Sequence, residues 1–316
     1  MNNQTLVSYV YLVGFQKLEN LYIPLFFLFL LIYIVTVSEN SLIIVLVSTS
    51  WNLESPMYFF LQQLSLCDLL MATNILPILL LIVIHDGVTI SFTGCMIQFY
   101  IFNWLEAFEC LLLSVMSFDR YLAICNPLRY TSIMNRTLCV ELSLLSWVLS
   151  LVSALLTGTF IATLEFCGHI INHFFCDLFP LLELSCSDTF FVQIEIVLQS
   201  IPVVFFPIVF IILTYIYIVS SVLKIVSSRG RQKAFSTCSS HLAVVSLFYG
   251  ALISIYLVPP SNQLLTFSKV LSLLYTVVIP MVNPLIYSLR NTDMKRAFRK
   301  LFRQKIYLFM NIKTGN

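Results

Sequence analysis

Residues 196–223 read IVLQSIPVVFFPIVFIILTYIYIVSSVL and hold no Asp, Glu, Lys or Arg. A helix needs about 20 consecutive apolar residues to cross the roughly 30 Å hydrocarbon core of a bilayer. This segment is long enough to do so, and it carries no charged group that would keep it wetted on the surface of a soluble domain. It therefore predicts a membrane-spanning helix.

Six further segments of similar length and hydropathy flank it. Two of them carry acids, at Asp68 and at Glu106 and Glu109, and the others carry no charge. The six segments are 21–38, 58–84, 92–118, 142–164, 242–268 and 270–289. Overall, 59% of the 316 residues are hydrophobic and 10% are charged, whereas soluble domains carry about 25% charged residues. The runs are too long and too uniform for the strands of a barrel, so the sequence predicts an all-α bundle of seven transmembrane helices.

Basic residues are concentrated at one end of the predicted bundle. Among the 17 Lys and Arg residues, only Lys17 and Lys269 fall on the other side if seven helices alternate in direction. Cytoplasmic loops of membrane proteins carry an excess of basic residues. We therefore expect a multi-pass plasma-membrane protein with an extracellular N-terminus (1–20), a seven-helix domain (21–290) and a cytoplasmic tail (291–316).

The tail has the pattern of a surface helix. Residues 293–302 repeat bulky apolar side chains at helical spacing among Lys and Arg residues. Such a basic amphipathic helix is expected to lie on the inner leaflet and to bind membrane lipid; a solvated basic tail is the alternative. Neither the tail nor any loop is large enough for a separate catalytic domain, which argues against an enzyme.

Covalent features are expected on the outer side. Cys95, Cys167, Cys176 and Cys186 all fall there, in an oxidising compartment. Four cysteines allow three pairings, and their spacing alone does not choose between them. Asn3 begins an Asn-Gln-Thr sequon and is a candidate for N-glycosylation.

Ionisable side chains within the predicted spans are functional candidates because they are costly to bury in a membrane. Asp68 is expected to meet Glu109 near the centre of the bundle, together with Asn40 and Asn283. Two carboxylates in a dry environment do not both stay charged without a cation or a proton between them. We therefore expect a sodium ion or a shared proton at Asp68 and Glu109, with a static hydrogen-bonded core as the alternative; no other cofactor is expected.

Two motifs lie at the expected cytoplasmic end. Asp119-Arg120-Tyr121 closes span three, where the acid can hold the arginine in a local ion pair until another partner competes for it. Asn283-Pro284 lies near the end of span seven. Proline breaks the helical hydrogen-bond ladder there, so this helix can bend or rotate.

Five stretches in a fixed order make the chain similar to a known family. They are Pro56-Met57-Tyr58-Phe59-Phe60-Leu61, Leu64-Ser65-Leu66-Cys67-Asp68, residues 116–130 (MSFDRYLAICNPLRY), residues 233–241 (KAFSTCSSH) and residues 280–291 (PMVNPLIYSLRN). In these stretches the chain resembles the rhodopsin-like G-protein-coupled receptors and, within them, the vertebrate odorant (olfactory) receptors. The resemblance covers nearly the whole chain.

The resemblance implies roles that spacing alone does not. It implies disulfides between Cys95 and Cys176 and between Cys167 and Cys186. It assigns G-protein coupling and switching to Asp119, Arg120, Tyr121, Tyr215, Lys233, His241, Asn283, Pro284 and Tyr287. His173 and Cys176 lie three residues apart, but a cysteine held in a disulfide is a poor ligand, so no metal site is expected.

The resemblance also implies a pocket in the outer half of the bundle, among spans three, five, six and seven. Its expected lining, with a cap from the loop before span five, is Phe102, Asn103, Glu106, Ala107, Leu178, Gln199, Val203, Tyr249, Leu252, Ile253, Tyr256 and Thr276. Mostly apolar walls with a few polar groups suit a small, volatile, partly hydrophobic ligand.

Two acids depart from the family pattern. Glu39 stands where relatives usually have glycine, and it faces either lipid headgroups or a neighbouring polar residue. Glu106 stands where relatives usually have a small residue. A charged Glu106 would favour an amine and a protonated one a carbonyl or hydroxyl, unless Glu106 only shares a proton with Glu109.

Together these features predict an odorant receptor. A small volatile ligand would shift the bundle between inactive and active populations, and the resemblance implies that the active form engages a stimulatory heterotrimeric G protein and raises cAMP. Nucleic acid is not expected as a partner. The alternatives are a receptor of the same fold that senses a metabolite outside the nose and, less favoured because no internal repeat is found, a proton- or ion-coupled transporter.

Overall fold

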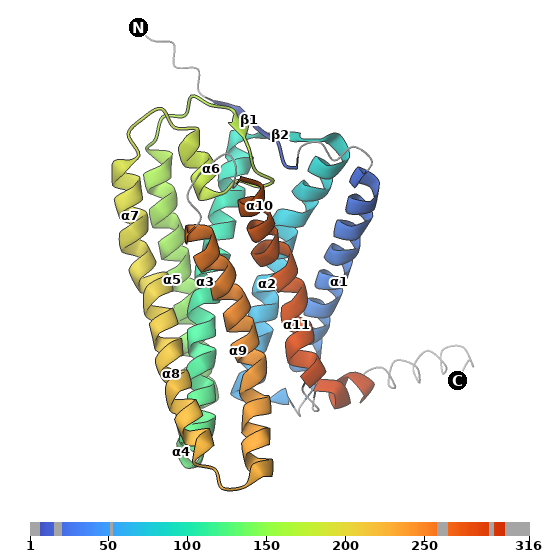
Figure 1. The fold of residues 1–316 in the computed structure, drawn as a ribbon, viewed down its shortest axis with the longest axis vertical. Coiled ribbons are helices and arrows are strands. Elements are labelled where there is room, and N and C mark those ends of the chain that lie inside the picture. Colours follow the sequence, from blue (N-terminus) through green and yellow to red (C-terminus); the bar gives the residue numbers. More distant parts are fainter. Residues whose placement is uncertain (1–6, 16–20, 51–52, 258–264, 291–293, 301–316) are drawn as a thin grey trace, which may run out of the picture.

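Seven helical segments that are long and apolar enough to cross a membrane run side by side (Figure 1). In the computed structural model, the described residues are 7–15, 21–50, 53–257, 265–290 and 294–300. The sequence prediction of an all-α bundle with seven spans is therefore confirmed.

The spans are continuous helices except for the fifth and the seventh, which contain a wider turn. In order they are α1 (Tyr22–Thr49), α2 (Pro56–His85), α3 (Phe92–Cys125), α5 (Arg136–Ala162), α7–η3–α8 (Phe190–Ser200, Ile201–Phe205 and Phe206–Leu223), α9 (Ser228–Leu257) and α10–η4–α11 (Leu265–Leu273, Leu274–Val278 and Ile279–Arg290). Two short helices, α4 (Pro127–Ile133) and α6 (Leu178–Glu183), lie in connecting segments. Residues 294–300 are also helical, at the position where a tail helix is predicted.

The helices differ in extent from the apolar runs that predict them. α1 continues through Glu39 and Asn40 to Thr49, and α9 begins at Ser228, well before the run 242–268. Hydrophobicity marks only the part of a helix that lies in hydrocarbon, whereas its backbone hydrogen bonds continue into polar turns. α9 ends at Leu257, and the next residues lie outside the described part of the chain.

Small side chains let α5 approach α3 closely. The buried residues of α5 are small at many positions, and they recur at helical spacing: Ser143, Ser146, Ser150, Ala154, Thr157 and Gly158. A methyl group added at Gly158 would lie 1.7 Å from Tyr100 Cε1 of α3. Small residues are typical of membrane helix interfaces because they allow backbones to pack together.

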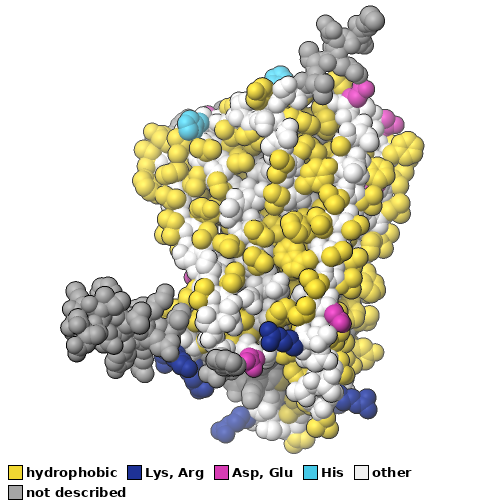
Figure 2. All heavy atoms as spheres, turned by 180° about the vertical axis from the view of Figure 1, so that it is seen from behind, with side chains coloured by type: hydrophobic (Ala, Val, Ile, Leu, Met, Phe, Trp, Pro, Cys, Tyr) yellow, Lys and Arg dark blue, Asp and Glu magenta, His cyan; other side chains and the backbone are white. Residues whose placement is uncertain are grey.

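The outer surface of the bundle is apolar around its middle. Figure 2 shows hydrophobic side chains over most of this belt, with Lys and Arg side chains gathered near one end. Residues such as Leu144, Phe206 and Ile212 are each at least half exposed although they are large and apolar. Such a surface suits contact with lipid chains rather than with water.

A small sheet closes the opposite end of the bundle, which we call the sheet end. β1 (Tyr9–Leu12) lies in the middle, antiparallel to β2 (Val88–Ser91) and parallel to β3 (Ile170–Ile171). Val10 and Leu12 of β1 are fully buried. The N-terminal segment is thus tied to the connections before span three and before span five, an arrangement that the sequence analysis does not predict.

Candidate functional site

Two disulfides fix the long connection between α5 and α7 at the sheet end. Cys95 pairs with Cys176 (Cα–Cα 5.5 Å) and Cys167 with Cys186 (Cα–Cα 5.8 Å), as the resemblance implies. The first bond ties the connection to the start of α3. It places Phe175, which is fully buried, with its ring centroid 5.0 Å from that of Phe102.

Lys269 fastens the N-terminal segment over the same end. Its Nζ donates to the carbonyl oxygen of Gly14 (2.6 Å) and to Oδ1 of Asn172 (2.7 Å). The ring of His173 packs against Phe174, with centroids 4.7 Å apart. Burial, with the nearby charge of Lys269, lowers the pKa of His173 to about 3, so its ring is neutral at physiological pH. Cys176 is in a disulfide, so its sulfur is a poor metal ligand.

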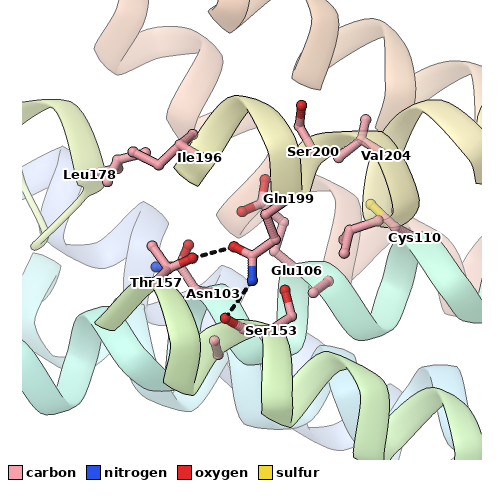
Figure 3. A pocket seen from close by; sticks show the side chains of 13 residues that line it. Asn103, Glu106, Cys110, Ser153, Thr157, Leu178, Ile196, Gln199, Ser200 and Val204 are labelled. Atoms are coloured by element: carbon pink, nitrogen blue, oxygen red, sulfur yellow. Dashed lines mark hydrogen bonds between the residues drawn. The ribbon is translucent and has the colours of Figure 1, made fainter. Parts of the chain in front are cut away.

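An inner cavity of about 70 Å³ lies between α3, α5 and the fifth span, with Leu178 of α6 also in its lining (Figure 3). Its walls combine apolar and polar side chains. They are Asn103, Glu106, Ala107, Cys110, Ser153, Ala154, Thr157, Leu178, Ile196, Gln199, Ser200, Val203 and Val204. Half of the expected pocket residues therefore meet here: Asn103, Glu106, Ala107, Leu178, Gln199 and Val203.

The other expected pocket residues lie outside this cavity. Phe102 packs under Phe175, and Tyr249 donates from its hydroxyl to the carbonyl oxygen of Cys110 (3.4 Å). Thr276 is fully buried and donates to the Ser272 carbonyl oxygen (2.7 Å). The remaining three differ in burial: Leu252 is buried, Ile253 is 42% exposed, and the side chain of Tyr256 lies outside the described set.

Span four supplies residues that the sequence analysis does not select. Gln199 donates from Nε2 to the carbonyl oxygen of Ser153 (2.7 Å), and its Oε1 accepts from the hydroxyl of Thr157 (Figure 3). The cavity therefore lies among spans three, four and five rather than three, five, six and seven. The signal in the sequence is the row of small polar residues in α5, of which Thr157 is the last.

Two acids gather at the cavity. Glu106 faces it from α3, and Asp177 lies close enough for the two charges to interact. Asp177 caps α6, with Oδ1 accepting from the Leu178 N–H at 2.8 Å, and burial raises the pKa of Asp177 to about 6. No Lys or Arg is among the described residues that line the cavity, so Glu106 has no basic side chain beside it in this lining.

A second polar cluster lies deeper in the bundle. Nδ2 of Asn283 lies 3.2 Å from both carboxyl oxygens of Asp68, and Glu109 is close enough for its charge to act on Asp68. Asn40 instead donates to the backbone carbonyl oxygens of Thr36 and Pro280, at 3.0 and 3.1 Å. The structure thus brings Asp68, Glu109 and Asn283 together, while Asn40 connects α1 to span seven beside them.

Glu39 points away from this cluster. It lines a hollow that also includes Pro284 of α11 and Lys295 and Arg299 of the helical segment 294–300. Its Oε2 is buried and has no hydrogen-bond partner within the described chain.

Asp119 and Arg120 form an ion pair at the end of the bundle opposite the sheet end. Arg120 donates from Nε to Asp119 Oδ2 at 2.9 Å, and its second guanidinium nitrogen contacts the same oxygen. The hydroxyl of Tyr130 in α4 donates to the other carboxyl oxygen at 2.7 Å. Arg120 is only 7% exposed, so the guanidinium is held inside the bundle, while Tyr121 stacks on Phe118 (ring centroids 6.4 Å apart).

Tyr215 and His241 join spans five and six near Arg120. The Tyr215 hydroxyl lies 2.8 Å from His241 Nδ1, and His241 Nε2 lies 3.2 Å from the Leu113 carbonyl oxygen of α3. A carbonyl accepts only, so Nε2 carries a proton and Nδ1 accepts from the tyrosine. Tyr287 is buried, and its hydroxyl has no hydrogen-bond partner within the described chain. This hydroxyl is thus left available for a partner in another arrangement of the helices.

Two predicted sites are not covered by the structure. Asn3 lies outside the described residues, and of Lys233 only the backbone, within α9, is described. Pro284 lies inside α11, as the sequence predicts.

Comparison with known proteins agrees with this architecture. The sequence profile of the family described as "Olfactory receptor" matches residues 29–305. The chain belongs to the olfactory receptor family. This receptor is 47% identical to human Olfactory receptor 11L1 over 96% of the chain and 94% of that protein, and 43% identical to human Olfactory receptor 5G3 (97% and 98%). It is 45% identical to rat Olfactory receptor 1468 over 96% of the chain and 98% of that protein.

Family membership fixes the class of activity. The receptor is a multi-pass plasma-membrane protein of the G-protein-coupled class that responds to odorants, and it is not an enzyme. The inner cavity and the Asp119–Arg120 pair lie at opposite ends of the helical bundle.

Proposed function

We propose that this receptor detects a small, mostly apolar odorant that carries an amine, and that it binds this odorant in the inner cavity. The observation that supports the proposal is the pair of acids at a cavity without a lining cation, Glu106 in the wall and Asp177 beside it. An ammonium group between two carboxyl groups favours their charged forms. The apolar remainder of the cavity suits a hydrocarbon chain.

Binding would act by shifting populations. The cavity of about 70 Å³ is smaller than the roughly 150 Å³ that accommodates benzene in a dry protein cavity. An odorant therefore favours forms in which α3, α5 and the fifth span lie further apart. We propose that these forms release Arg120 from Asp119, engage a stimulatory G protein and raise cAMP.

The same proposal gives the receptor a direction in the membrane. Nearly all Lys and Arg residues belong to the end that carries Arg120, and such residues favour the cytoplasmic side. The N-terminus and the sheet end would then be extracellular, with the segment 294–300 against the inner leaflet.

We further propose that Asp68 and Glu109 hold a sodium ion or a shared proton. Oε1 of Glu109 and Oδ1 of Asn40 are buried without a hydrogen-bond partner in the described structure, and Asp68 is buried beside Glu109. Oxygen atoms of this kind suit a hard cation or a proton. Sodium chloride should raise the unfolding temperature of the receptor above that in choline chloride, and Asp68→Asn should remove the difference. An equal effect in Asp68→Asn would exclude the ion.

The ligand proposal is tested by changing Glu106 alone. Cells that express the receptor with a stimulatory G protein would be exposed to volatile primary amines and to the alcohols of the same chain length, with cAMP as the readout. Glu106→Gln should lower the potency of the amines about 10- to 100-fold, the value of a hydrogen bond to a charged group, and leave the alcohols nearly unchanged.

The controls separate binding from signalling. Arg120→Ala should abolish every response while surface staining of an N-terminal tag stays the same. Equal responses of wild type and Glu106→Gln to amines would refute the role of Glu106. A cAMP response to alcohols but not to amines in the wild type would reassign the odorant class.

A further inference from the structure

The sheet end of the bundle is covered by connecting segments. Phe174 and Phe175 are fully buried residues of the connection that the two disulfides fix, and β3 of the sheet belongs to the same connection. Lys269 fastens the segment at Gly14 on the same side. From the same connection, Leu178 of α6 lines the inner cavity.

A second hollow, which we call the lateral groove, opens on the outer face of the bundle between α5 and the fifth span. It has a volume of about 700 Å³, and its lining is almost entirely apolar. Phe191, which is 71% exposed, and Leu198, which is 62% exposed, stand at its rim. This face belongs to two membrane spans, so the groove opens to lipid chains.

The lateral groove and the inner cavity share a wall. Ser153, Gln199 and Val203 line both. The barrier between the two is therefore one layer of side chains, held by the hydrogen bonds of Gln199 to the Ser153 carbonyl oxygen and to Thr157. A rotation of the Gln199 side chain would break both bonds and open one hollow to the other.

One polar side chain in the lining of the groove has a buried atom without a hydrogen-bond partner in the described structure. Glu195 is 8% exposed, and Thr157 Oγ1 lies 3.3 Å from its Oε1. Its Oε2 is buried and has no hydrogen-bond partner within the described chain. The Thr157 hydroxyl has a single proton for two acceptors, Glu195 and Gln199. A neutral Glu195 supplies the second proton, donating from Oε1 to Thr157, which in turn donates to Gln199; Oε2 then remains a free carbonyl acceptor.

From this arrangement we propose that the lateral groove is a binding vestibule for odorants dissolved in the bilayer, and that they pass from it into the inner cavity. The vestibule takes an apolar molecule with one O–H or N–H donor, which bonds to Oε2 of Glu195. The molecule then replaces the Gln199 side chain between the two hollows. This route rests on the proposed function, because it delivers the ligand to the cavity assigned there.

The backbone beside the groove favours such a passage. η3 (Ile201–Phe205) is a wide turn that begins two residues after Gln199, and Pro202 within it lines the groove. Proline donates no backbone hydrogen bond, and wide turns of this kind are frequent at functional sites. The helix at this point has fewer internal bonds to break when its neighbouring side chains move.

Photolabelling tests the vestibule without any need for signalling. The full receptor in phosphatidylcholine nanodiscs would be irradiated with decanol that carries a diazirine in its chain, or with the methyl ether of the same molecule. Labelled peptides would be mapped by mass spectrometry. The alcohol should label α5 and α7 at the groove about three- to tenfold more than the ether, which lacks the donor, as expected for one hydrogen bond.

Two substitutions of Glu195 check the acceptor. Glu195→Leu should reduce labelling by the alcohol to the level of the ether, whereas Glu195→Gln, which keeps a carbonyl oxygen, should retain most of it. Equal labelling by the alcohol and the ether, or full labelling in Glu195→Leu, would overturn the vestibule. Loss of labelling when cholesterol is added to the discs would show that the groove is a lipid site, which also overturns it.

The route is tested by filling the groove. Ile194→Trp should abolish labelling both of the groove and of the α3 peptide from Asn103 to Cys110. Val197→Trp is the matched control, because Val197 is an exposed residue of the same helix that lines neither hollow. Leu149→Trp fills the groove from α5 and replaces Ile194→Trp if that variant does not fold.

The outcomes distinguish the two proposals. Labelling of α3 that persists after the groove is filled would mean that ligand enters elsewhere and would refute the route. A labelled groove and α3 in a receptor whose amine responses do not depend on Glu106 would leave the route in place and refute the proposed ligand alone.

Discussion

Replacing Asp177 with Asn should stabilise the receptor at neutral pH and leave its stability unchanged in acid. Burial raises the pKa of Asp177 from 3.8 to about 6, so the folded receptor binds a proton that the unfolded chain releases between about pH 4 and pH 6. Folding stability due to this group therefore falls as pH rises through that window and stays low above it. Asn carries no charge and avoids this loss.

The size of the effect follows from the change in pKa. A pKa raised from 3.8 to about 6 corresponds to at most about 3 kcal/mol at pH 7.5. The side chain is half-buried, and water screens part of the charge, so we expect about 1–2 kcal/mol. Asn keeps the oxygen that accepts from the Leu178 N–H at 2.8 Å, and the cap of α6 is preserved. An increase in unfolding temperature of about 2–5 °C should result.

The assay is thermal unfolding of the purified receptor, followed by tryptophan fluorescence between pH 4.0 and pH 8.0. Asp188→Asn is the matched control, because Asp188 is exposed and also accepts a backbone N–H, from Phe190 at 2.9 Å. Only Asp177→Asn should gain stability above pH 6, and its curve should meet the wild-type curve near pH 4. A constant gap at all pH values, or no gap at pH 7.5, would refute the reasoning.

Three further changes test other parts of the structure. Gly158→Ala places a methyl group 1.7 Å from Tyr100 Cε1 and should cost about 1–3 kcal/mol in thermal unfolding; Gly250→Ala, with nothing within 4 Å, should cost far less. Lys269→Met leaves the Gly14 carbonyl oxygen of the N-terminal segment without its donor, which should lower the free energy of unfolding by about 1–3 kcal/mol. The same change should speed proteolysis of that segment, and an unchanged cleavage rate would contradict the role of Lys269. Asp119→Asn should weaken the hold on the neighbouring arginine and raise ligand-independent nucleotide exchange on the G protein, and a basal rate equal to wild type would argue against the closed pair.

The spans could be read from the sequence because a bilayer imposes one simple requirement on each of them. The sheet could not. β1 and β3 are short, with four and two residues, and their pairing depends on a segment more than 150 residues away in the chain. Nothing in the sequence around Tyr11 indicates that its backbone pairs with that of Ile170.

The candidate site shows a similar division. Glu106 and Gln199 could be placed by resemblance, since the positions of the third and fifth spans fix them. In the sequence, span four is an apolar run without a defined face, so Ser153 and Thr157 do not stand out. The resemblance places Tyr249 in the pocket, but its hydroxyl reaches the Cys110 carbonyl oxygen and closes the space between α9 and α3. Which of two neighbouring helices closes a gap depends on packing, and a single sequence does not specify it.

The small inner cavity affects how the receptor performs in time. A resting cavity of about 70 Å³ means that forms with room for an odorant are a minority, and apparent affinity is reduced by that fraction. In the proposed binding mode, the tendency of the cavity walls to close favours release of the odorant, which shortens the time that it stays bound. Weak, brief occupancy would end the signal soon after the odorant concentration falls.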